Sequence, residues 1–500
     1  MKFLQKLRDV SVPLCVVETA DPAETISNAV GELNGTTDKT AVLQWSLPYG
    51  LEGVNPTGKD CQRQINPKGA IESSNPTQCL KILRDKLPEG SIVFFHNAQN
   101  FLKAPDVQQA VWFLRDEFTS RRCIWIGLCP SITLPECLKH DIIVISEPLP
   151  GVEEIKPIVE KVCRNVERDL GLKTSEDTKQ RLFRSSMGLS GFGVQQAVSL
   201  AVTPKGISVE MVIERRRAFV GQTKGVEIRT DKTRFSDIKG YRSIVELLTQ
   251  IIANQEFPIS LVLWFDEIEK MYAGYGGDSS GVTDDQVGVW LTQFQDWLNA
   301  DRFSGIVCVG PPGVSKSMLA TSLRNECKCE CVRIDAGGMK GSLVGESEEY
   351  ARMAVKTIEA LSGGGQILCI ATANDLTNVP SSLLSRFVLG TYFYDLPNKD
   401  EAEAILGSKR VKYNVPETDL APDVTNWTGR EINQLCFLHK RLGVNLLTAA
   451  KRVACYHRSS AEELKVLREK ANGKWLSASH EGLYSIPSIE NGRKFVKTAE

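Results

Sequence analysis

A short turn of small residues between two apolar stretches constrains this 500-residue chain more than any other feature. Residues 305–309 have the composition of a buried strand, Gly310-Pro-Pro-Gly-Val-Ser-Lys316-Ser317 follows, and residues 318–325 have a helical pattern. A strand, a tight loop and a helix in this order are typical of a phosphate-binding loop, in which backbone N–H groups and the positive end of the helix hold the anion. We therefore expect a nucleotide site here; a chance Gly/Pro turn is the alternative.

The loop contains most of the candidate nucleotide contacts. Lys316 is expected to reach the terminal phosphates, and the hydroxyl of Ser317 is expected to hold Mg²⁺. Ser315 stands where this motif usually has its second glycine, and a serine would be strained there if the position requires a positive φ. The predicted nucleotide-binding residues are Gly310, Pro311, Pro312, Gly313, Val314, Ser315, Lys316, Ser317 and Met318.

A second apolar stretch, Leu261-Val-Leu-Trp-Phe265, ends in Asp266 and Glu267. A strand that ends in two acids suits a magnesium site beside a general base. Asp266 would bind Mg²⁺, directly or through water, and Glu267 would polarise the attacking water. The alternative is a strand that runs into the acidic start of a helix.

Three later residues are further candidates for the same site. Asn374 ends an apolar stretch and could position water near the γ-phosphate, or it could belong to an ordinary turn. Arg386 follows a short helical pattern and suits an arginine finger that acts on the nucleotide of a neighbouring subunit; a surface arginine is the alternative. Arg430 opens a helical pattern in the C-terminal region and could reach the nucleotide from a lid.

Together these residues resemble the AAA+ superfamily. Phe235-Ser-Asp-Ile-Lys-Gly240 is similar to the motif on the adenine side of AAA modules, and Ser342-Leu-Val-Gly-Glu-Ser-Glu348 is similar to the segment with the first pore loop. The set resembles AAA ATPases with a degenerate ATPase-like domain in front, which occur in plastid and cyanobacterial genomes and, rearranged, in phages. This resemblance implies an α/β fold, with a parallel-sheet P-loop NTPase core and a helical lid. It also implies ATP and Mg²⁺ as cofactors and a homo-oligomer with shared nucleotide sites.

The order of the motifs is unusual, because in a common AAA+ chain the acidic strand follows the phosphate-binding loop. Here Asp266 precedes Lys316. Catalytic groups lie at the carboxyl ends of parallel strands, so relinking the strands at the opposite edge can leave a site intact. We expect a permuted but complete site; the alternative is two incomplete halves, with the acidic strand in another module.

Residues 12–147 alternate β-branched stretches with helical patterns, which predicts another parallel sheet with helices on both faces. The loop at residues 18–23 has no glycine or lysine to hold a phosphate. The stretch 92–95 ends in His96 and Asn97, where a hydrolytic ATPase has Asp and Glu. We interpret this region as a degenerate, non-hydrolysing ATPase-like domain; an unrelated α/β domain is the alternative.

The chain is expected to contain six segments. They are a degenerate P-loop-like α/β domain (1–150), a helical lid-like subdomain (151–202), a linker (203–240), an AAA+ core in permuted order (241–397), a helical lid (398–470) and a C-terminal extension (471–500). Residues 48–76, rich in Gly, Pro, Asn and Ser, are predicted to form a long loop. The run Arg215-Arg-Arg217 suggests a solvated helix face, with binding to nucleic acid or an acidic partner as the alternative.

Composition narrows the choice of partner and compartment. The formal net charge is −1, so no global field favours nucleic acid or an anionic membrane, and no apolar run is long enough to span a bilayer. The fourteen cysteines form no CxxC pair, and Cys327, Cys329 and Cys331 are expected to be reduced thiols rather than metal ligands. Acids follow the basic N-terminus at once, so we expect a cytoplasmic protein rather than a secreted one.

Three hypotheses about function follow. The first is an ATP-hydrolysing oligomer that remodels a protein partner, and the second is a nucleotide-gated assembly module with little turnover, which Ser315 motivates. The third, a nucleic-acid motor or loader, fits the composition least. Threading AAA proteins usually have an aromatic residue in the first pore loop, where this chain has Leu343 and Val344, and this difference argues against protein threading.

Overall fold

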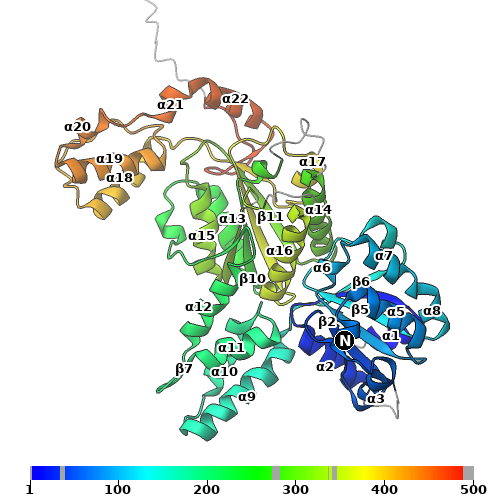
Figure 1. Cartoon of the computed structure of the whole chain (residues 1–500). Helices are drawn as coiled ribbons and strands as arrows, with labels where there is room; N and C mark the ends of the chain where they lie inside the picture. Colours follow the sequence, from blue (N-terminus) through cyan, green and yellow to red (C-terminus); the bar gives the residue numbers. More distant parts are fainter. Residues whose placement is uncertain (1–2, 34–39, 273–281, 336, 340–345, 488–500) are drawn as a thin grey trace, which may run out of the picture. The chain divides into compact units, whose positions relative to one another are not determined.

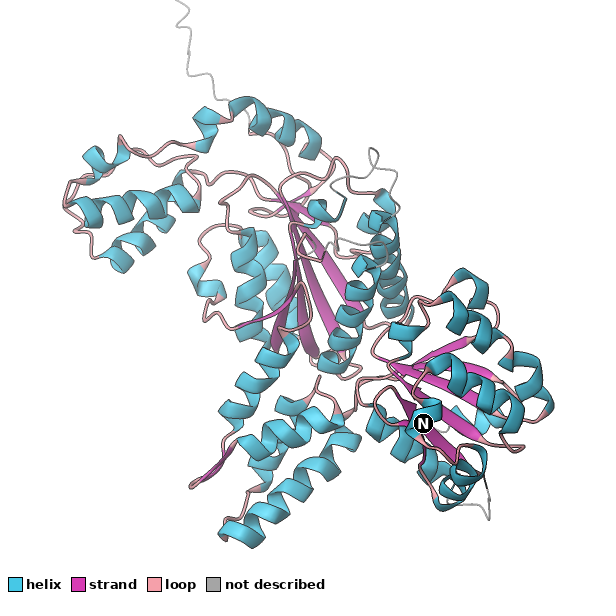
Figure 2. Cartoon of the chain, viewed as in Figure 1, coloured by secondary structure: helices cyan, strands magenta, loops and turns pink. Residues whose placement is uncertain are grey.

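The computed structural model describes residues 3–33, 40–272, 282–335, 337–339 and 346–487. The chain divides into two compact units, Met1–Phe219 and Val220–Glu500 (Figure 1). Each unit is built around its own mostly parallel β-sheet, with helices packed against the sheet (Figure 2). This arrangement confirms the predicted mixed α/β fold class.

The first unit contains a six-stranded sheet. Its strands are β1 (Leu14–Glu18), β2 (Val42–Ser46), β3 (Gly50–Gly53), β4 (Ile92–His96), β5 (Ile124–Cys129) and β6 (Ile143–Ser146). In space they follow the order β3-β2-β4-β5-β1-β6, in which β3 is antiparallel to β2 and the other neighbours are parallel. The accompanying helices are α1 (Phe3–Asp9), α2 (Pro22–Leu33), α3 (Pro56–Ile65), α4 (Ala70–Ser73), α5 (Pro76–Lys86), α6 (Ala98–Phe101), α7 (Pro105–Trp112), α8 (Leu114–Ser120) and the 3₁₀ helix η1 (Glu136–Leu138).

The prediction of a long loop at residues 48–76 was wrong, because this segment contains β3, α3 and α4. Asn55 caps α3, and its side chain accepts a hydrogen bond from the backbone N–H of Gly58 at 2.7 Å. Pro56 occupies the first turn of the helix, where its missing N–H costs nothing. The Asn-Pro start signal was therefore present, but the many turn-forming residues around it concealed it.

The first unit ends in a helical part that packs around its own apolar cluster. Its elements are α9 (Val152–Leu170), α10 (Glu176–Ser186), α11 (Gly191–Leu200), the hairpin of β7 (Val202–Thr203) and β8 (Gly206–Ile207), and α12 (Val209–Val220). Residues 203–240, predicted as a linker, contain β8, α12, β9 (Val226–Arg229) and the 3₁₀ helix η2 (Phe235–Asp237). Helix α12 buries Val212, and the same segment later contributes strand β9 (Val226–Arg229) to the second sheet.

The second unit contains a seven-stranded sheet. Besides β9 its strands are β10 (Ile259–Asp266), β11 (Phe303–Val309), β12 (Glu330–Asp335), β13 (Gln366–Ala373), β14 (Thr391–Phe393) and β15 (Leu476–Ser477). They follow the order β15-β14-β11-β13-β10-β12-β9, with β9 antiparallel to β12 and the other neighbours parallel. Its helices are η2 (Phe235–Asp237), α13 (Arg242–Ala253), η3 (Ile268–Tyr272), α14 (Val282–Asn299), α15 (Lys316–Cys327), α16 (Glu346–Ser362), α17 (Ser381–Leu384), α18 (Lys399–Tyr413), α19 (Gly429–Leu442), α20 (Leu446–Ala450), α21 (Tyr456–Ser459) and α22 (Ala461–Ala471).

The two sheets correspond strand by strand, although the chain visits the strands in different orders. From the antiparallel edge inwards, β3, β2, β4, β5, β1 and β6 match β9, β12, β10, β13, β11 and β14. Strand β4 follows β1 in the chain, whereas its counterpart β10 precedes β11. The residues directly after β4 and β10, Asn97 and Glu267, both have a left-handed backbone, with φ of 56° and 52°.

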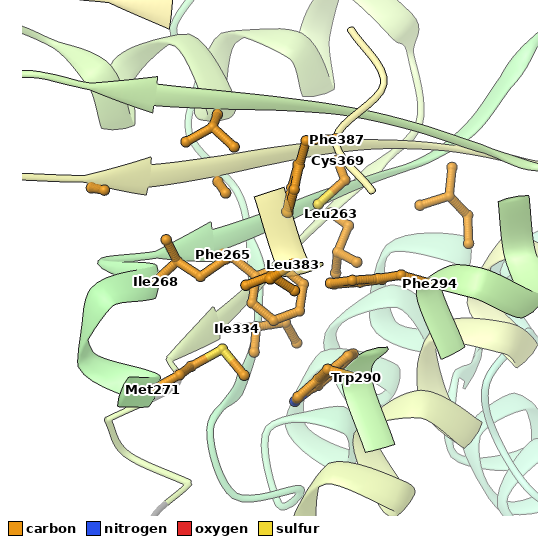
Figure 3. Close-up of a cluster of buried hydrophobic side chains, with 14 of the residues drawn as sticks. Leu263, Phe265, Ile268, Met271, Trp290, Phe294, Ile334, Cys369, Leu383 and Phe387 are labelled. Atoms are coloured by element: carbon orange, nitrogen blue, oxygen red, sulfur yellow. The ribbon is translucent and has the colours of Figure 1, made fainter. Parts of the chain in front are cut away.

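Strand β10 is fixed in this sheet by an aromatic cluster against α14 (Figure 3). The ring of Phe265 contacts those of Trp290 and Phe294 edge-on, with centroid distances of 4.8 and 5.4 Å. All three side chains are at most 1% exposed, and burying a Phe side chain contributes roughly 1.5–3 kcal/mol. The acidic strand is thus an integral part of the sheet that carries the phosphate-binding loop.

Residues 474–487 cover the edge of the second sheet, a role that their aromatic and Gly/Pro-rich sequence did not indicate. Strand β15 pairs with β14, and the ring of Tyr484 packs on Phe393 at a centroid distance of 4.6 Å. The hydroxyl of Tyr484 donates to Asp395 at 2.6 Å, and Arg468 of α22 donates to the same carboxylate at 2.8 Å. This C-terminal segment is therefore anchored to the chain between β14 and α18.

Candidate functional site

A cavity of about 520 Å³ lies at the carboxyl ends of β10, β11 and β13. Its walls come from these strand ends, from the loop before α15 and from helices α18 and α19. The lining residues are Asp266, Glu267, Pro312, Gly313, Ser315, Lys316, Ser317, Thr372, Ala373, Asn374, Lys409, Gly429, Arg430 and Asn433. Strands that are adjacent in the sheet thus bring together groups that are far apart in the sequence.

The loop before α15 has the left-handed backbone that its sequence led us to suspect. Ser315 has φ 67° and ψ 18°, and Gly313 has φ 89°. A serine in this conformation costs roughly 1–2 kcal/mol relative to glycine. Gly310 is required for a different reason, since a Cβ there would lie 2.2 Å from the carbonyl oxygen of Tyr394.

Lys316 is folded into the loop at the base of the cavity. Its ammonium donates to the carbonyl oxygens of Gly310 at 2.6 Å and Pro311 at 2.8 Å, and to Asn374 Oδ1 at 3.1 Å. Burial lowers the pKa of Lys316 to about 8, against the opposing effect of nearby Glu269. A phosphate in the cavity would supply the negative charge that a buried ammonium needs.

Asn374 is held by Glu269, a residue that sequence reasoning missed. One oxygen of Glu269 accepts hydrogen bonds from the backbone N–H of Asn374 at 2.9 Å and from its side-chain amide at 3.2 Å. Burial raises the pKa of Glu269. The sequence signal for Glu269 is the acidic run Asp266-Glu-Ile-Glu269, which continues past the two acids that end the strand.

Thr372 fixes both acids at the end of β10. Its hydroxyl donates to Asp266 Oδ1 at 3.0 Å, and the same oxygen accepts from the backbone N–H of Glu267 at 3.2 Å. The carboxylate of Glu267 forms an ion pair with Lys270 one turn later. The sequence indicates nothing of this, because the contact depends on the register between β10 and β13.

Asp266 and Ser317 line the same cavity, as a joint metal site requires. A carboxylate and a hydroxyl are hard oxygen ligands of the kind that Mg²⁺ prefers, with water completing its octahedron. The donor set therefore fits Mg²⁺ bound with a nucleotide. If Asp266 lay on another sheet or at the opposite edge of this one, it could not share a metal ion with Ser317.

The segment predicted as a helical lid contributes Arg430 and two cavity residues that sequence reasoning missed, Lys409 and Asn433. Thr428 caps α19, and its side chain accepts from the backbone N–H of Glu431 at 3.3 Å. The backbone N–H of Arg430 donates to the carbonyl oxygen of Gly313 at 3.4 Å. Lys409 and Asn433 had no sequence signal, since their position depends on how the lid helices pack.

Several predicted residues do not line the cavity in the part of the chain that the structure describes. Val314 is buried in an apolar cluster and Met318 packs against it. Arg386 donates to the carbonyl oxygen of Ser382 and to Ser385 Oγ, outside its own chain's cavity. The motif at residues 235–240 packs on α15, where the backbone N–H of Phe235 donates to Glu326 at 3.1 Å; Leu343 and Val344 lie outside the described residues.

In the first unit, the pocket beside the loop after β1, the strand that matches β11, is small and acidic. A pocket of about 80 Å³ lies next to the loop after β1. Burial, followed by the charges of Asp21, Glu147 and Glu154, raises the pKa of Glu24 in this pocket. Its lining residues are Thr19, Ala20, Asp21, Glu24, Asn28, Glu147, Pro148, Leu149, Pro150, Glu154, Ser190 and Gly191. Four carboxylates with no lysine or arginine among these residues would repel a phosphate.

Two segments of the chain match known families. Residues 2–146 match the family described as SpoVK-like AAA ATPase, N-terminal domain, and residues 306–363 match the ATPase family associated with various cellular activities (AAA). The second match runs from β11 to the end of α16, so it includes Lys316 and Ser317 but not Asp266. Over these two segments the chain is thus similar to AAA ATPases, with the SpoVK-like segment in front.

Three similar proteins share one description, uncharacterized AAA domain-containing protein ycf46. The protein of Guillardia theta is 21% identical over 458 residues, which cover 80% of this chain and 82% of that protein. The protein of Pyropia yezoensis is 23% identical over 354 residues (61% and 63%), and that of Gracilaria tenuistipitata var. liui is 22% identical over 393 residues (68% and 70%). Among the described residues, no helix combines the length and the apolar character that a membrane span needs.

Proposed function

We propose that this chain binds and hydrolyses ATP at the cavity of the second unit, with residues 241–397 as the ATPase core and 398–470 as its lid. The observation that carries this proposal is that Asp266, Lys316 and Ser317 line one cavity, although β10 precedes β11 in the chain. A permuted AAA+ core of the phage-like kind, with the acidic strand moved ahead of the phosphate-binding loop, accounts for this order. The first sheet supports this interpretation: its strands occupy the same relative positions, but there β4 follows β1 in the chain, whereas β10 precedes β11.

The side chains of the cavity suit hydrolysis of a phosphoanhydride. Lys316 would neutralise the phosphates, and Ser317 and Asp266 would hold Mg²⁺, which supplies positive charge to the phosphate oxygens when it is bound. Glu267 would accept a proton from the attacking water. Asn374 would orient that water or the γ-phosphate, because its amide already contacts Lys316.

The active form in this proposal is a homo-oligomer that remodels a protein partner in the cytoplasm. Arg386 would complete the site of a neighbouring subunit, which fits its position outside the cavity of its own chain. Arg430 would instead contact the nucleotide of its own chain, since it lines that cavity. Movement of the lid would then follow the state of the nucleotide.

A second candidate function is a nucleotide-gated assembly module with little turnover. Two observations favour it: the left-handed backbone at Ser315 and the ion pair that engages the carboxylate of Glu267 with Lys270. Both would slow hydrolysis without preventing binding. ATP would then act only by changing the assembly state.

Phosphate release by the wild-type chain, by Glu267→Gln and by Lys316→Ala separates the two candidates. An ATPase loses about 100-fold or more of its rate in Glu267→Gln while still binding ATP, because only the base is removed. Lys316→Ala loses nucleotide binding itself. Equal rates in the wild type and Glu267→Gln would favour the assembly module, and unchanged binding by Lys316→Ala would place the nucleotide elsewhere. A pull-down with Glu267→Gln in ATP would retain a partner that hydrolysis normally releases.

A further inference from the structure

The carboxylate of Asp266 is engaged by an arginine that no sequence motif pointed to. Arg333 on β12 donates to Asp266 Oδ2 from Nη2 at 2.7 Å and from Nε at 3.1 Å. The other carboxylate oxygen accepts from the Thr372 hydroxyl at 3.0 Å. The side chains of Asp266 and Arg333 are 16% and 27% exposed, so solvent screens their charges less than those of a surface pair.

Arg333 is shared with a second acid on the neighbouring strand. Its Nη1 lies 3.3 Å from Oε2 of Glu227, which stands opposite Arg333 in the antiparallel register of β9 and β12. The guanidinium also lies over the ring of Trp264, 5.4 Å from its centroid. Arg333 therefore forms ion pairs with two carboxylates, those of Asp266 and Glu227.

The first unit has the same arrangement at the equivalent positions, with different residues. Gln44 on β2 stands opposite Glu52 on β3, as Arg333 stands opposite Glu227. The side chain of Gln44 contacts His96, the last residue of β4, at 3.2 Å between Oε1 and Nε2. His96 thus stands where the second unit has Asp266, and the neutral amide of Gln44 stands where it has Arg333. At these equivalent positions, the charged pair is found in the unit with the predicted phosphate-binding loop.

We infer that Arg333 is a positioning residue that sets how readily Asp266 accepts Mg²⁺, and that Glu227 tunes it. The inference rests on the proposed function, in which Asp266 holds the metal. Arg333 keeps the carboxylate in place, but its positive charge opposes a second cation at the same group. Glu227 attracts part of that charge and so lowers the opposition. Mg²⁺ affinity at the nucleotide site therefore depends on β9, the first strand after the boundary between the units.

Binding of a fluorescent ADP analogue, mant-ADP, to the full chain tests this inference when Mg²⁺ is titrated at fixed nucleotide. Arg333→Gln keeps an amide donor for Asp266 but removes the charge, so its Mg²⁺ midpoint falls about threefold or more. Glu227→Gln removes a negative charge that partly offsets Arg333 and that also pairs with Arg229 at 2.8 Å, so its midpoint rises by a similar factor. The double variant follows Arg333→Gln, because Glu227 acts through Arg333. Arg242→Gln is the matched control, since Arg242 forms an exposed pair with Glu246 on α13 and its midpoint stays unchanged.

Binding in EDTA distinguishes this role from a merely structural one. A structural role would weaken metal-free binding and move both single variants in the same direction. Shifts of the same sign, or midpoints within twofold of the wild type for both variants, would overturn the inference. Absence of mant-ADP binding by the wild-type chain under every condition would instead overturn the proposed function.

Discussion

A single carboxylate oxygen of Glu269 accepts hydrogen bonds from both nitrogens of Asn374, at 2.9 and 3.2 Å. Because the amide nitrogen of Asn374 faces Glu269, its oxygen faces Lys316 at 3.1 Å. Glu269 therefore orients the amide that stands between the acidic strand and the phosphate-binding loop. This contact joins η3, β13 and α15 at the centre of the candidate site.

Replacing Glu269 with alanine is expected to slow ATP hydrolysis more than it weakens nucleotide binding. The variant leaves two donors of Asn374 without their acceptor, which costs about 1–3 kcal/mol. A cost of this size in the transition state lowers kcat by about 5- to 150-fold. The affinity for ADP should change by less than about threefold. Glu269→Gln keeps one oxygen and serves as the control; a loss of kcat as large as that of Glu269→Ala would contradict the assigned role.

Thr372 gives a prediction about stability as well as activity. Its buried hydroxyl contacts Asp266 and the backbone of Glu267, so Thr372→Val leaves that N–H without its partner at nearly constant volume. We expect the free energy of unfolding of the second unit to fall by about 1–3 kcal/mol, with a parallel loss of activity.

Thr372→Ser is the matched comparison, because it keeps the hydroxyl and loses only a methyl group. Thermal unfolding followed by calorimetry should place its transition between those of the wild type and Thr372→Val. If the serine variant is as unstable as the valine variant, packing rather than hydrogen bonding explains the contribution of this residue.

Ser315 leads to a prediction of increased stability. With φ at 67°, Ser315→Gly removes the steric cost of a Cβ in the left-handed region, which should stabilise the loop by about 1 kcal/mol. Ser315→Ala keeps the Cβ and should show no such gain. The midpoint of thermal unfolding and the affinity for mant-ADP measure the effect, and equal stability of the two variants would show that strain at this position is negligible.

Strands β10, β11 and β13 of the second sheet could be predicted because each is an apolar run that is followed by a distinctive motif. Asp266 ends β10, Asn374 follows β13, and the loop that begins at Gly310 follows β11; parallel strands bring these carboxyl ends to one edge. The site residues that were not predicted do not stand at the end of an apolar run. Thr372 and Arg333 lie inside strands, and their contacts with Asp266 depend on strand register, which a local pattern does not specify.

In the predicted lid and in the first unit, too, residues with a local sequence signal could be predicted, whereas residues placed by tertiary packing could not. Arg430 follows a Thr-Gly helix start that could be recognised, whereas Lys409 faces the cavity only because α18 packs beside α19. In the first unit, the match of His96 and Asn97 to Asp266 and Glu267 was expected from their place after a strand. The acidic pocket around Glu24 was not, since its residues come from α2, α9 and the start of α11.

In the proposed site, one metal ion bound with nucleotide contacts both Asp266 and Ser317. Iron(II) in place of Mg²⁺, added with ADP and ascorbate, cleaves a polypeptide next to the residues that hold the metal. We expect two cuts in the full chain, one beside Asp266 and one beside Ser317, both dependent on ADP and both lost in Lys316→Ala. Cleavage beside Ser317 alone, with none near Asp266, would contradict this expectation.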